Sequence, residues 1–306
     1  MKNTKPWLLF ALITTVFWGL WGAFTNVPAE NGFPDTLIYC VWALTMVVPA
    51  IYILKRNKGQ LQTDGKSVLY GLIIGLLGAG GQMILFYAVT IGPTYLIFPI
   101  VSLSPVATII LSFFFLKERT GKLGALGIVL ALVALPLFDY AGDTATTATG
   151  NNVLWFSLAI LILMAWGVQA YFMKLANHTM NVESIFFYMM VSGLMLIPVA
   201  WYMTDFSKEI NWGLSGPYLA AGIQILNAIG ALCLVYAFRF GKAMVVSPMT
   251  NAGAPLITSI ISMLVLGLVP GNYKIAGIAL AIIAAFLLAL DPNDAEDQND
   301  NVGHPL

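Results

Sequence analysis

Charge is scarce in this sequence. Asp, Glu, Lys and Arg together make up 9% of its 306 residues, whereas a typical soluble domain carries about 25%. Hydrophobic residues make up 59%, and the mean hydropathy is +0.85. The chain therefore lacks the polar surface that a water-soluble globule needs. The formal net charge of zero says nothing about partners, although we expect no nucleic acid among them.

Cysteine and histidine are also rare, with two of each. Cys40 and Cys233 lie inside apolar runs, where a thiol behaves as a small hydrophobe, so they predict neither a disulfide nor a metal site. Neither His178 nor His304 has a companion ligand at metal-binding spacing. The apolar runs also hold no cluster of acid, base and nucleophile. We therefore expect no metal, no cofactor and no enzymatic activity.

Apolar residues instead come in long runs. About 20 of them cross a hydrocarbon layer of roughly 30 Å, and each run should be helical because lipid offers the backbone no hydrogen-bonding partner. The first run, Trp7–Thr25, is longer than the core of a cleaved signal peptide, so we interpret it as a retained helix. The ten expected helices cover residues 7–26, 34–54, 67–91, 94–116, 121–139, 153–175, 183–204, 216–239, 243–268 and 272–290.

The positive charges fix an orientation. With the amino terminus in the cytoplasm, twelve of the 14 Lys and Arg residues fall in cytoplasmic segments, and only Lys208 and Lys274 fall outside. Lys and Arg in short loops are hard to translocate, so this segregation supports both the helix count and two cytoplasmic termini. Residues 291–306 are acidic and poor in apolar side chains, which predicts a disordered cytoplasmic tail. We expect the surrounding membrane to be a bacterial inner (plasma) membrane.

The chain repeats itself at a shift of about 148 to 150 residues. The matched landmarks are Trp18-Gly19 with Trp166-Gly167, Asp35 with Glu183, Tyr87-Ala88 with Tyr236-Ala237, Pro99 with Pro248, Pro105 with Pro255, and Gly121 with Gly271. This pattern predicts a first five-helix repeat in residues 1–140, a polar linker in 141–152 and a second repeat in 153–290.

An odd number of crossings gives the second repeat the opposite orientation to the first. Inverted repeats place a pseudo-two-fold axis in the membrane plane, with a substrate site near the midplane between the halves. The fold class we expect is therefore an all-α integral membrane protein with ten transmembrane helices in two inverted repeats. This symmetry favours a carrier that works by alternating access. A passive channel remains an alternative, and a membrane-embedded receptor or enzyme is a more distant one.

The landmarks resemble the EamA-type branch of the drug/metabolite transporter superfamily. The most diagnostic stretch contains Ser104-Pro105-Val106, then Phe115-Leu116-Lys117-Glu118-Arg119, then Gly127-Ile128-Val129-Leu130. The resemblance extends over most of residues 7–290 and implies translocation of metabolites such as amino acids. The second half departs from the pattern, since Leu268-Val269 stands where Glu118-Arg119 would recur. We interpret Glu118 and Arg119 as a charged pair that caps a helix end at the cytoplasmic surface.

Small and amide-bearing residues share one face of the third and eighth expected helices. Gly71, Gly75, Gly78 and Gln82 are spaced to lie together on a helix. The matching positions of the second half are Ala220, Gln224, Asn227 and Ala231. Small residues permit close helix packing, which is the alternative interpretation of this face. Amides in hydrocarbon are costly unless they face partners or water, so Gln82, Gln224 and Asn227 are candidates for lining a central cavity.

Further candidates come from the other matched helices. Trp18, Trp21, Trp166 and Gln169 lie well inside their spans, where they could line the cavity or pack between helices. Ser102, Thr250 and Asn251 lie close to prolines in the fourth and ninth helices. We interpret Trp7, Trp155 and Trp212 instead as anchors at the membrane surface. Proline kinks a helix, so a further hypothesis makes hinges of the paired prolines, which are Pro99, Pro105, Pro248 and Pro255.

Carboxylates are missing from the middle of every expected span. Asp35, Asp139 and Glu183 all lie at helix ends, so a buried-carboxylate proton relay is not expected. The cavity should be neutral, aromatic and amide-rich, which suits an amino-acid-like solute that is zwitterionic or uncharged. The sequence leaves open the solute, the direction of transport, any coupling ion and whether the chain is a monomer or a homodimer.

Overall fold

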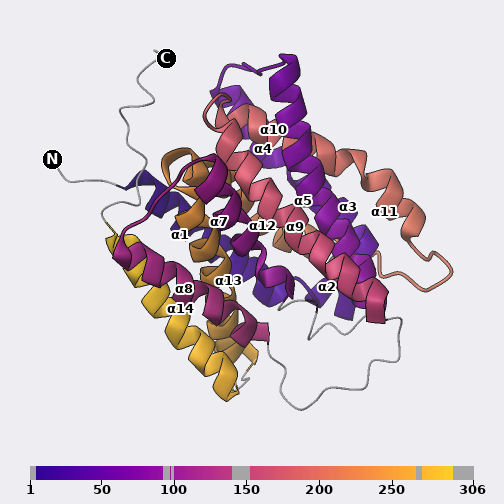
Figure 1. Ribbon diagram of the computed structural model, residues 1–306. Helices are drawn as coiled ribbons and strands as arrows, with labels where there is room; N and C mark the ends of the chain where they lie inside the picture. The colour runs from indigo at the N-terminus through magenta and orange to yellow at the C-terminus, as the bar shows by residue number, and fades with distance from the viewer. Residues whose placement is uncertain (1–4, 92–96, 98–99, 140–151, 267–270, 292–306) are drawn as a thin grey trace.

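The computed structural model describes residues 5–91, 97, 100–139, 152–266 and 271–291. Across these ranges the chain is helical, without any β-strand (Figure 1). The helices of the first half are α1 (Pro6–Phe24), α2 (Val27–Glu30), α3 (Asp35–Thr45), α4 (Val47–Arg56), α5 (Gly65–Ile91), α7 (Ser104–Phe115) and α8 (Lys122–Asp139). Those of the second are α9 (Asn152–Ala176), α10 (Val182–Met195), α11 (Ile197–Met203), the short π-helix η1 (Leu214–Tyr218), α12 (Leu219–Phe240), α13 (Ala243–Leu266) and α14 (Asn272–Leu290).

Eight helical segments in the described part of the chain are long and apolar enough to cross a bilayer. Two shorter apolar helices, Ile100–Phe115 and Lys122–Leu137, accompany them. Large apolar side chains also project outward, and Phe114 and Leu264 are 68% and 80% exposed. Exposed apolar surface of this extent fits lipid better than water. The expectation of an all-helical chain with membrane-spanning segments is confirmed.

Two expected helices are each broken in the middle. The helix expected over 34–54 ends at Thr45 and restarts at Val47, and the one expected over 183–204 breaks at Leu196. Proline lacks an N–H and its ring collides with the carbonyl four residues earlier. Pro49 and Pro198 follow the breaks by two or three residues. Both breaks therefore have the same cause and occupy matching places in the repeat, and each expected span is retained across its break, as Asp35–Arg56 and Val182–Met203.

The helices of each half pack mainly on helices of the other half. Helix α1 packs on α12 and α13, while its counterpart α9 packs on α5 and α7. Likewise α3 packs on α12, and the counterpart α10 packs on α5. Helices α8 and α14, which end the two halves, lie side by side at one edge of the bundle (Figure 1). The halves are thus interlocked, and the contacts of α1 and α3 have counterparts in those of α9 and α10.

Individual hydrogen bonds repeat in the same way. Thr258 Oγ1 donates to the carbonyl of Gly19 at 2.9 Å, and Thr108 Oγ1 donates to that of Gly167 at 3.0 Å. A Cβ atom at Gly19 would collide with Ile257, and one at Gly167 would collide with Ala107. The glycine of each Trp-Gly motif therefore permits a helix of the other half to approach its backbone.

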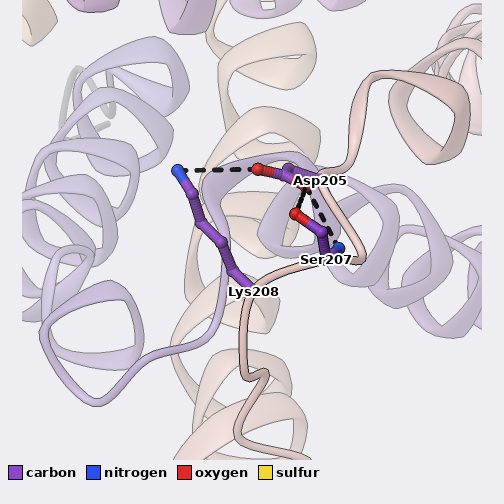
Figure 2. Close-up of polar contacts among 3 residues, drawn as sticks. All are labelled: Asp205, Ser207 and Lys208. Atoms are coloured by element: carbon purple, nitrogen blue, oxygen red, sulfur yellow. Dashed lines mark hydrogen bonds and ion pairs between the residues drawn. The ribbon is translucent and has the colours of Figure 1, made fainter.

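The loop between α11 and η1 is ordered by Asp205. Its carboxylate accepts hydrogen bonds from the Ser207 backbone N–H at 3.1 Å and from Ser207 Oγ at 2.6 Å, and it lies 3.7 Å from Lys208 Nζ (Figure 2). The Ser207 hydroxyl and backbone N–H hold the pKa of this carboxyl below its usual value. Further along the loop, the Asn211 N–H donates to the Gly32 carbonyl at 3.1 Å, so the loop reaches across to the first half.

Candidate functional site

Trp18 and Trp166 hold the interlocked helices together. Trp18 Nε1 donates to the backbone carbonyl of Asn227 at 3.2 Å, and Trp166 Nε1 donates to that of Gly78 at 3.3 Å. Each indole lies against a glycine of the helix that it contacts, Gly230 for Trp18 and Gly81 for Trp166, where an added Cβ would come within 2.5 Å of the ring. The two tryptophans therefore occupy matching packing positions between the halves.

A cavity of about 140 Å³ lies between α1, α3, α5 and α12, where helices of the two halves pack on each other. Four of the sequence candidates contribute to it, namely Trp21, Gln82, Gln224 and Asn227. The other lining residues are Thr25, Asn26, Asp35, Ile38, Tyr39, Trp42 and Leu85. Thr25 and Asn26 follow α1, and Asp35 begins α3, so the cavity reaches toward the end of the bundle where these helices meet.

Indole groups bind the amides of the cavity wall. Trp21 Nε1 donates to Gln224 Oε1 at 2.9 Å, and Trp42 Nε1 donates to Asn227 Oδ1 at 2.8 Å. Gln224 Nε2 in turn donates to Thr25 Oγ1 at 3.4 Å. Because each bond joins the first half to α12, the wall itself is a contact between halves, and the amide oxygens of Gln224 and Asn227 each accept one indole N–H group.

The remaining sequence candidates lie outside the cavity. Gln169 packs on Gly78, where an added Cβ would meet its amide. Thr250 is buried and donates to the carbonyls of Val246 and Ser247 in its own helix, and Asn251 donates to Ser247 as well. Ser102 is half-buried. The structure thus brings together the candidates from the first, third and eighth expected helices and not those from the fourth, sixth and ninth.

Seven lining residues were not among the candidates, and three of these are aromatic or acidic residues of α3. Tyr39 and Trp42 lie on α3 with ring centroids 5.2 Å apart, and Asp35 opens the same helix. Asp35 was noted only as a repeat landmark at a helix end. At the shift that pairs Asp35 with Glu183, Trp42 matches Met190 in the second half, so a search for repeated polar or aromatic positions passes over it.

The opposite end of the bundle is joined by hydrogen bonds centred on Gln62, which precedes α5. Its side chain donates to the Thr179 carbonyl at 3.0 Å and accepts from the Asn181 N–H at 2.7 Å. Its backbone N–H donates to Ser184 Oγ at 3.0 Å, and its carbonyl accepts from the Tyr188 hydroxyl at 2.8 Å. All four bonds join the first half to the segment around α9 and α10.

Glu118 joins the halves at the same end. Its carboxylate is buried and accepts the backbone N–H groups of Ala243 and Met244 at 2.9 and 3.0 Å, at the start of α13. The neighbouring Arg119 guanidinium lies 3.8 Å from the centroid of the Phe113 ring and donates to the Phe113 carbonyl. Glu118 is therefore a helix cap, and the helix that it caps belongs to the other half.

The three tryptophans assigned to the membrane surface differ in exposure. Trp212 is 54% exposed, whereas Trp7 is 0% and Trp155 is 7% exposed. Trp7 packs on Gly241, at the junction of α12 and α13. Since Trp7 and Trp155 are buried inside the protein, the interpretation of these two as anchors to lipid head groups was wrong.

The prolines proposed as hinges occupy unlike environments. Pro105 lies at the second position of α7, just after a break at Leu103, whereas Pro248 and Pro255 lie inside the continuous helix α13. Pro99 lies outside the described residues.

Asp291, the first residue of the expected tail, is fully buried, and its carboxylate accepts from the Gly124 N–H at 2.6 Å. The rest of that tail, like the expected linker, lies outside the described residues apart from Asn152, which begins α9.

Comparisons with known proteins find relatives and a fold. The model of the EamA-like transporter family matches twice, over residues 5–138 and 153–290. LicB of Haemophilus influenzae is 24% identical over 77% of this chain and 82% of its own length. The pseudopaline exporter CntI of Pseudomonas aeruginosa is 26% identical over 78% of this chain and 81% of its own. A solved crystal structure, 16% identical, shares the fold with a TM-score of 0.76, covering 92% of this chain and 98% of that one.

Proposed function

Because the chain belongs to the EamA-like transporter family, we propose that it moves a small metabolite across the membrane by alternating access, with the cavity between its halves as the substrate site. Its multiple apolar spans and its family make it an integral membrane protein. The relative named as a pseudopaline exporter supports transport as the activity.

One observation carries the mechanism: the cavity lies toward one end of the bundle, while hydrogen bonds between the halves join the other end. The cavity is lined by residues of both halves, so a rocking of one half against the other would change its access. The bonds of Gln62 and Glu118 would have to break for the opposite end to open. Binding a solute from one side and releasing it to the other needs this alternation.

The topology that we propose has ten crossings in two inverted repeats. The eight long spans and the two shorter apolar helices would supply them, and the reciprocal contacts of α1 with α12 and of α9 with α5 support a two-fold relation. The two family matches support repeats within 1–140 and 153–290, joined by a linker at 141–152. On the distribution of Lys and Arg we propose that both termini lie in the cytoplasm, and we propose a bacterial inner membrane as the surrounding membrane. The Gln62 end would then face the cytoplasm.

For the substrate we propose an amino-acid-like solute that is zwitterionic or neutral. The cavity wall presents amides and aromatic rings, which can bind such a solute without the clustered cations that a multiply charged anion needs. A volume of about 140 Å³ is below the roughly 300 Å³ at which drug-sized pockets begin. A solute of few heavy atoms fits this cavity.

The mechanism is tested by crosslinking in proteoliposomes. In a variant with Cys40 and Cys233 replaced by Ser, cysteines at Gln62 and Thr179 are joined by a short bifunctional thiol reagent with a reducible linker. We expect counterflow of labelled solute to stop and to recover after reduction. The matched control joins Asn57 to Gln60 within one loop, where Asn57 Nδ2 donates to the Gln60 carbonyl.

The same assay separates a carrier from a pore. A carrier shows trans-stimulation of labelled uptake, whereas a pore shows none. Undiminished transport in the crosslinked Gln62 and Thr179 pair would refute alternating access at this end. Uptake without trans-stimulation would assign the chain to the passive channels.

A further inference from the structure

Positive charge gathers in the segment that joins α4 to α5. Residues 55–66, which we call the basic segment, hold four cations, namely Lys55, Arg56, Lys58 and Lys66. All four side chains are exposed, and within the described part of the chain none of them forms an ion pair. The one acidic residue of the segment, Asp64, accepts a backbone N–H group at the start of α5. The basic segment therefore carries positive charge that the described protein does not neutralise.

Local structure does not explain all four cations. A cation in the last turn of a helix stabilises the helix through its dipole, so Lys55 and Arg56 have a local role in α4. The first turn favours anions instead, yet Lys66 lies there in α5, with its Nζ 5.5 Å from the centroid of the Tyr70 ring. Lys58 has a φ of +54°, in the left-handed region that suits Gly or Asn better than lysine. At these two positions the local backbone favours other residues, so the reason for a lysine lies outside the local structure.

An exposed apolar stripe leads along α4 to its two cations. Val48, Ile51 and Tyr52 are all exposed, and their spacing places them on the same face of the helix as Lys55 and Arg56. Exposed apolar side chains of a membrane helix lie against acyl chains, and tyrosine is typical of the level where acyl chains meet head groups. This face of α4 thus presents an apolar surface, an interfacial ring and two cations in order along its axis. A phospholipid with an acidic head group has the complementary order of groups.

We propose that the basic segment and the exposed face of α4 bind an anionic phospholipid of the surrounding bilayer. The cations of the segment bind the phosphate, and an acyl chain lies along Val48, Ile51 and Tyr52. Arginine can bind a phosphate through two parallel hydrogen bonds, and lysine binds it as a point charge. Clusters of about four to eight cations beside a membrane span are the pattern by which proteins recognise acidic lipids. The site depends on the membrane insertion of the chain and not on the proposed transport, so each can fail without the other.

The bound lipid would also act on the contact between the halves. Gln62 lies inside the basic segment, and its hydrogen bonds join the first half to the segment around α9 and α10. A lipid that binds the segment in this conformation favours the state in which those bonds are formed, because a ligand stabilises the conformation that it binds. We therefore expect acidic lipid to raise the temperature at which the purified chain unfolds.

The binding test compares phosphatidylglycerol with phosphatidylcholine of identical acyl chains, by native mass spectrometry of the detergent-purified chain. We expect phosphatidylglycerol to bind about tenfold more tightly and to raise the unfolding temperature, which phosphatidylcholine should leave unchanged. Equal binding of the two lipids would overturn the proposal. Glycerol phosphate, a water-soluble head group, tests the source of the phosphate and should bind far more weakly because it has no acyl chain. Binding as tight as that of the intact lipid would assign the segment to soluble phosphates and overturn the lipid as its occupant.

Substitutions then locate the site. Replacing Lys55 and Arg56 together by Gln should weaken the binding of phosphatidylglycerol about tenfold and leave that of phosphatidylcholine unchanged. The double variant Lys55→Arg with Arg56→Lys keeps both charges and should keep most of the affinity. Thermal unfolding of each variant without added lipid reports folding independently.

The matched control replaces Lys117 and Lys122 by Gln. These two cations are exposed at the turn from α7 to α8, so the control removes the same charge from a different segment and should change lipid binding little. If the control weakens the binding of phosphatidylglycerol as much as the loss of Lys55 and Arg56 does, the attraction is spread over the surface and the proposed site is refuted. Unchanged binding after the loss of Lys55 and Arg56 would refute it as well.

Discussion

Removing the Glu118 carboxylate should weaken the attachment of one half to the other. It accepts two backbone N–H groups at the start of α13, and the side chain is 8% exposed. A hydrogen bond to a charged group contributes about 1.5–3 kcal/mol, and a donor left buried without a partner costs about as much. Taking the lower value for each of the two bonds, we expect Glu118→Ala to lower the free energy of unfolding by about 3 kcal/mol.

A conservative variant separates the hydrogen bonds from the charge. Glu118→Gln keeps one acceptor oxygen, so it should lose about half as much, roughly 1.5 kcal/mol. Unfolding is followed by circular dichroism in mixed micelles as the fraction of denaturing detergent rises. The control is Glu30→Ala, at an exposed position of α2, which should change little. If Glu118→Ala unfolds no earlier than Glu30→Ala, or if the Gln variant is the less stable of the two, the capping argument is refuted.

Three other outcomes follow from the described contacts. Gly230→Ala would place a Cβ 2.5 Å from Trp18 and should lower the free energy of unfolding by about 1–3 kcal/mol. Gly222→Ala in the same helix meets nothing within 4 Å and should leave the stability unchanged or raise it. Equal effects of the two variants on unfolding in detergent would contradict the close packing of Trp18 on Gly230. Ser207→Ala should raise the pKa of Asp205 toward its usual value in carboxyl NMR titrations. Because folding lowers that pKa, the carboxylate stabilises the loop above its ordinary pKa, and this contribution disappears as the pH falls through the lowered value. Pro248→Ala should slow turnover more than it weakens solute binding, and unchanged turnover would remove the hinge hypothesis.

The sequence predicted the helices well because each one satisfies its own backbone in lipid. Long apolar runs and the turn formers between them were sufficient to place most elements. The breaks at Met46 and Leu196 were missed, although Pro49 and Pro198 are visible in the sequence. A proline inside a span does not always end the helix, since Pro248 lies inside the unbroken helix α13. Packing around the proline decides between these outcomes, and packing is a property of the assembled bundle.

The site was only partly predictable for a related reason. Gln224 and Asn227 were found because an amide in a span needs a polar partner. The partners themselves, Trp21 and Trp42, come from helices far away in the chain, and no spacing rule links them. Gln169 and Trp21 match in the repeat, yet one packs on a glycine and the other lines the cavity. Because the two halves carry different side chains at matched positions, their polar groups lie differently at the two ends of the bundle. A search for positions that the halves share overlooks such differences.

The exchange of partners between the halves also determines how the chain can be made. Translation delivers the first repeat to the membrane before α9, α10, α12 and α13 exist, yet these are the helices on which α1, α3 and α5 pack. The glycine-lined face of α5 is therefore exposed to lipid until α9 and α10 are inserted and Trp166, Tyr188 and Ser192 pack on it. Tertiary structure then forms late and nearly all at once, so a ribosome that stalls in the second repeat would leave a set of inserted helices without a fold.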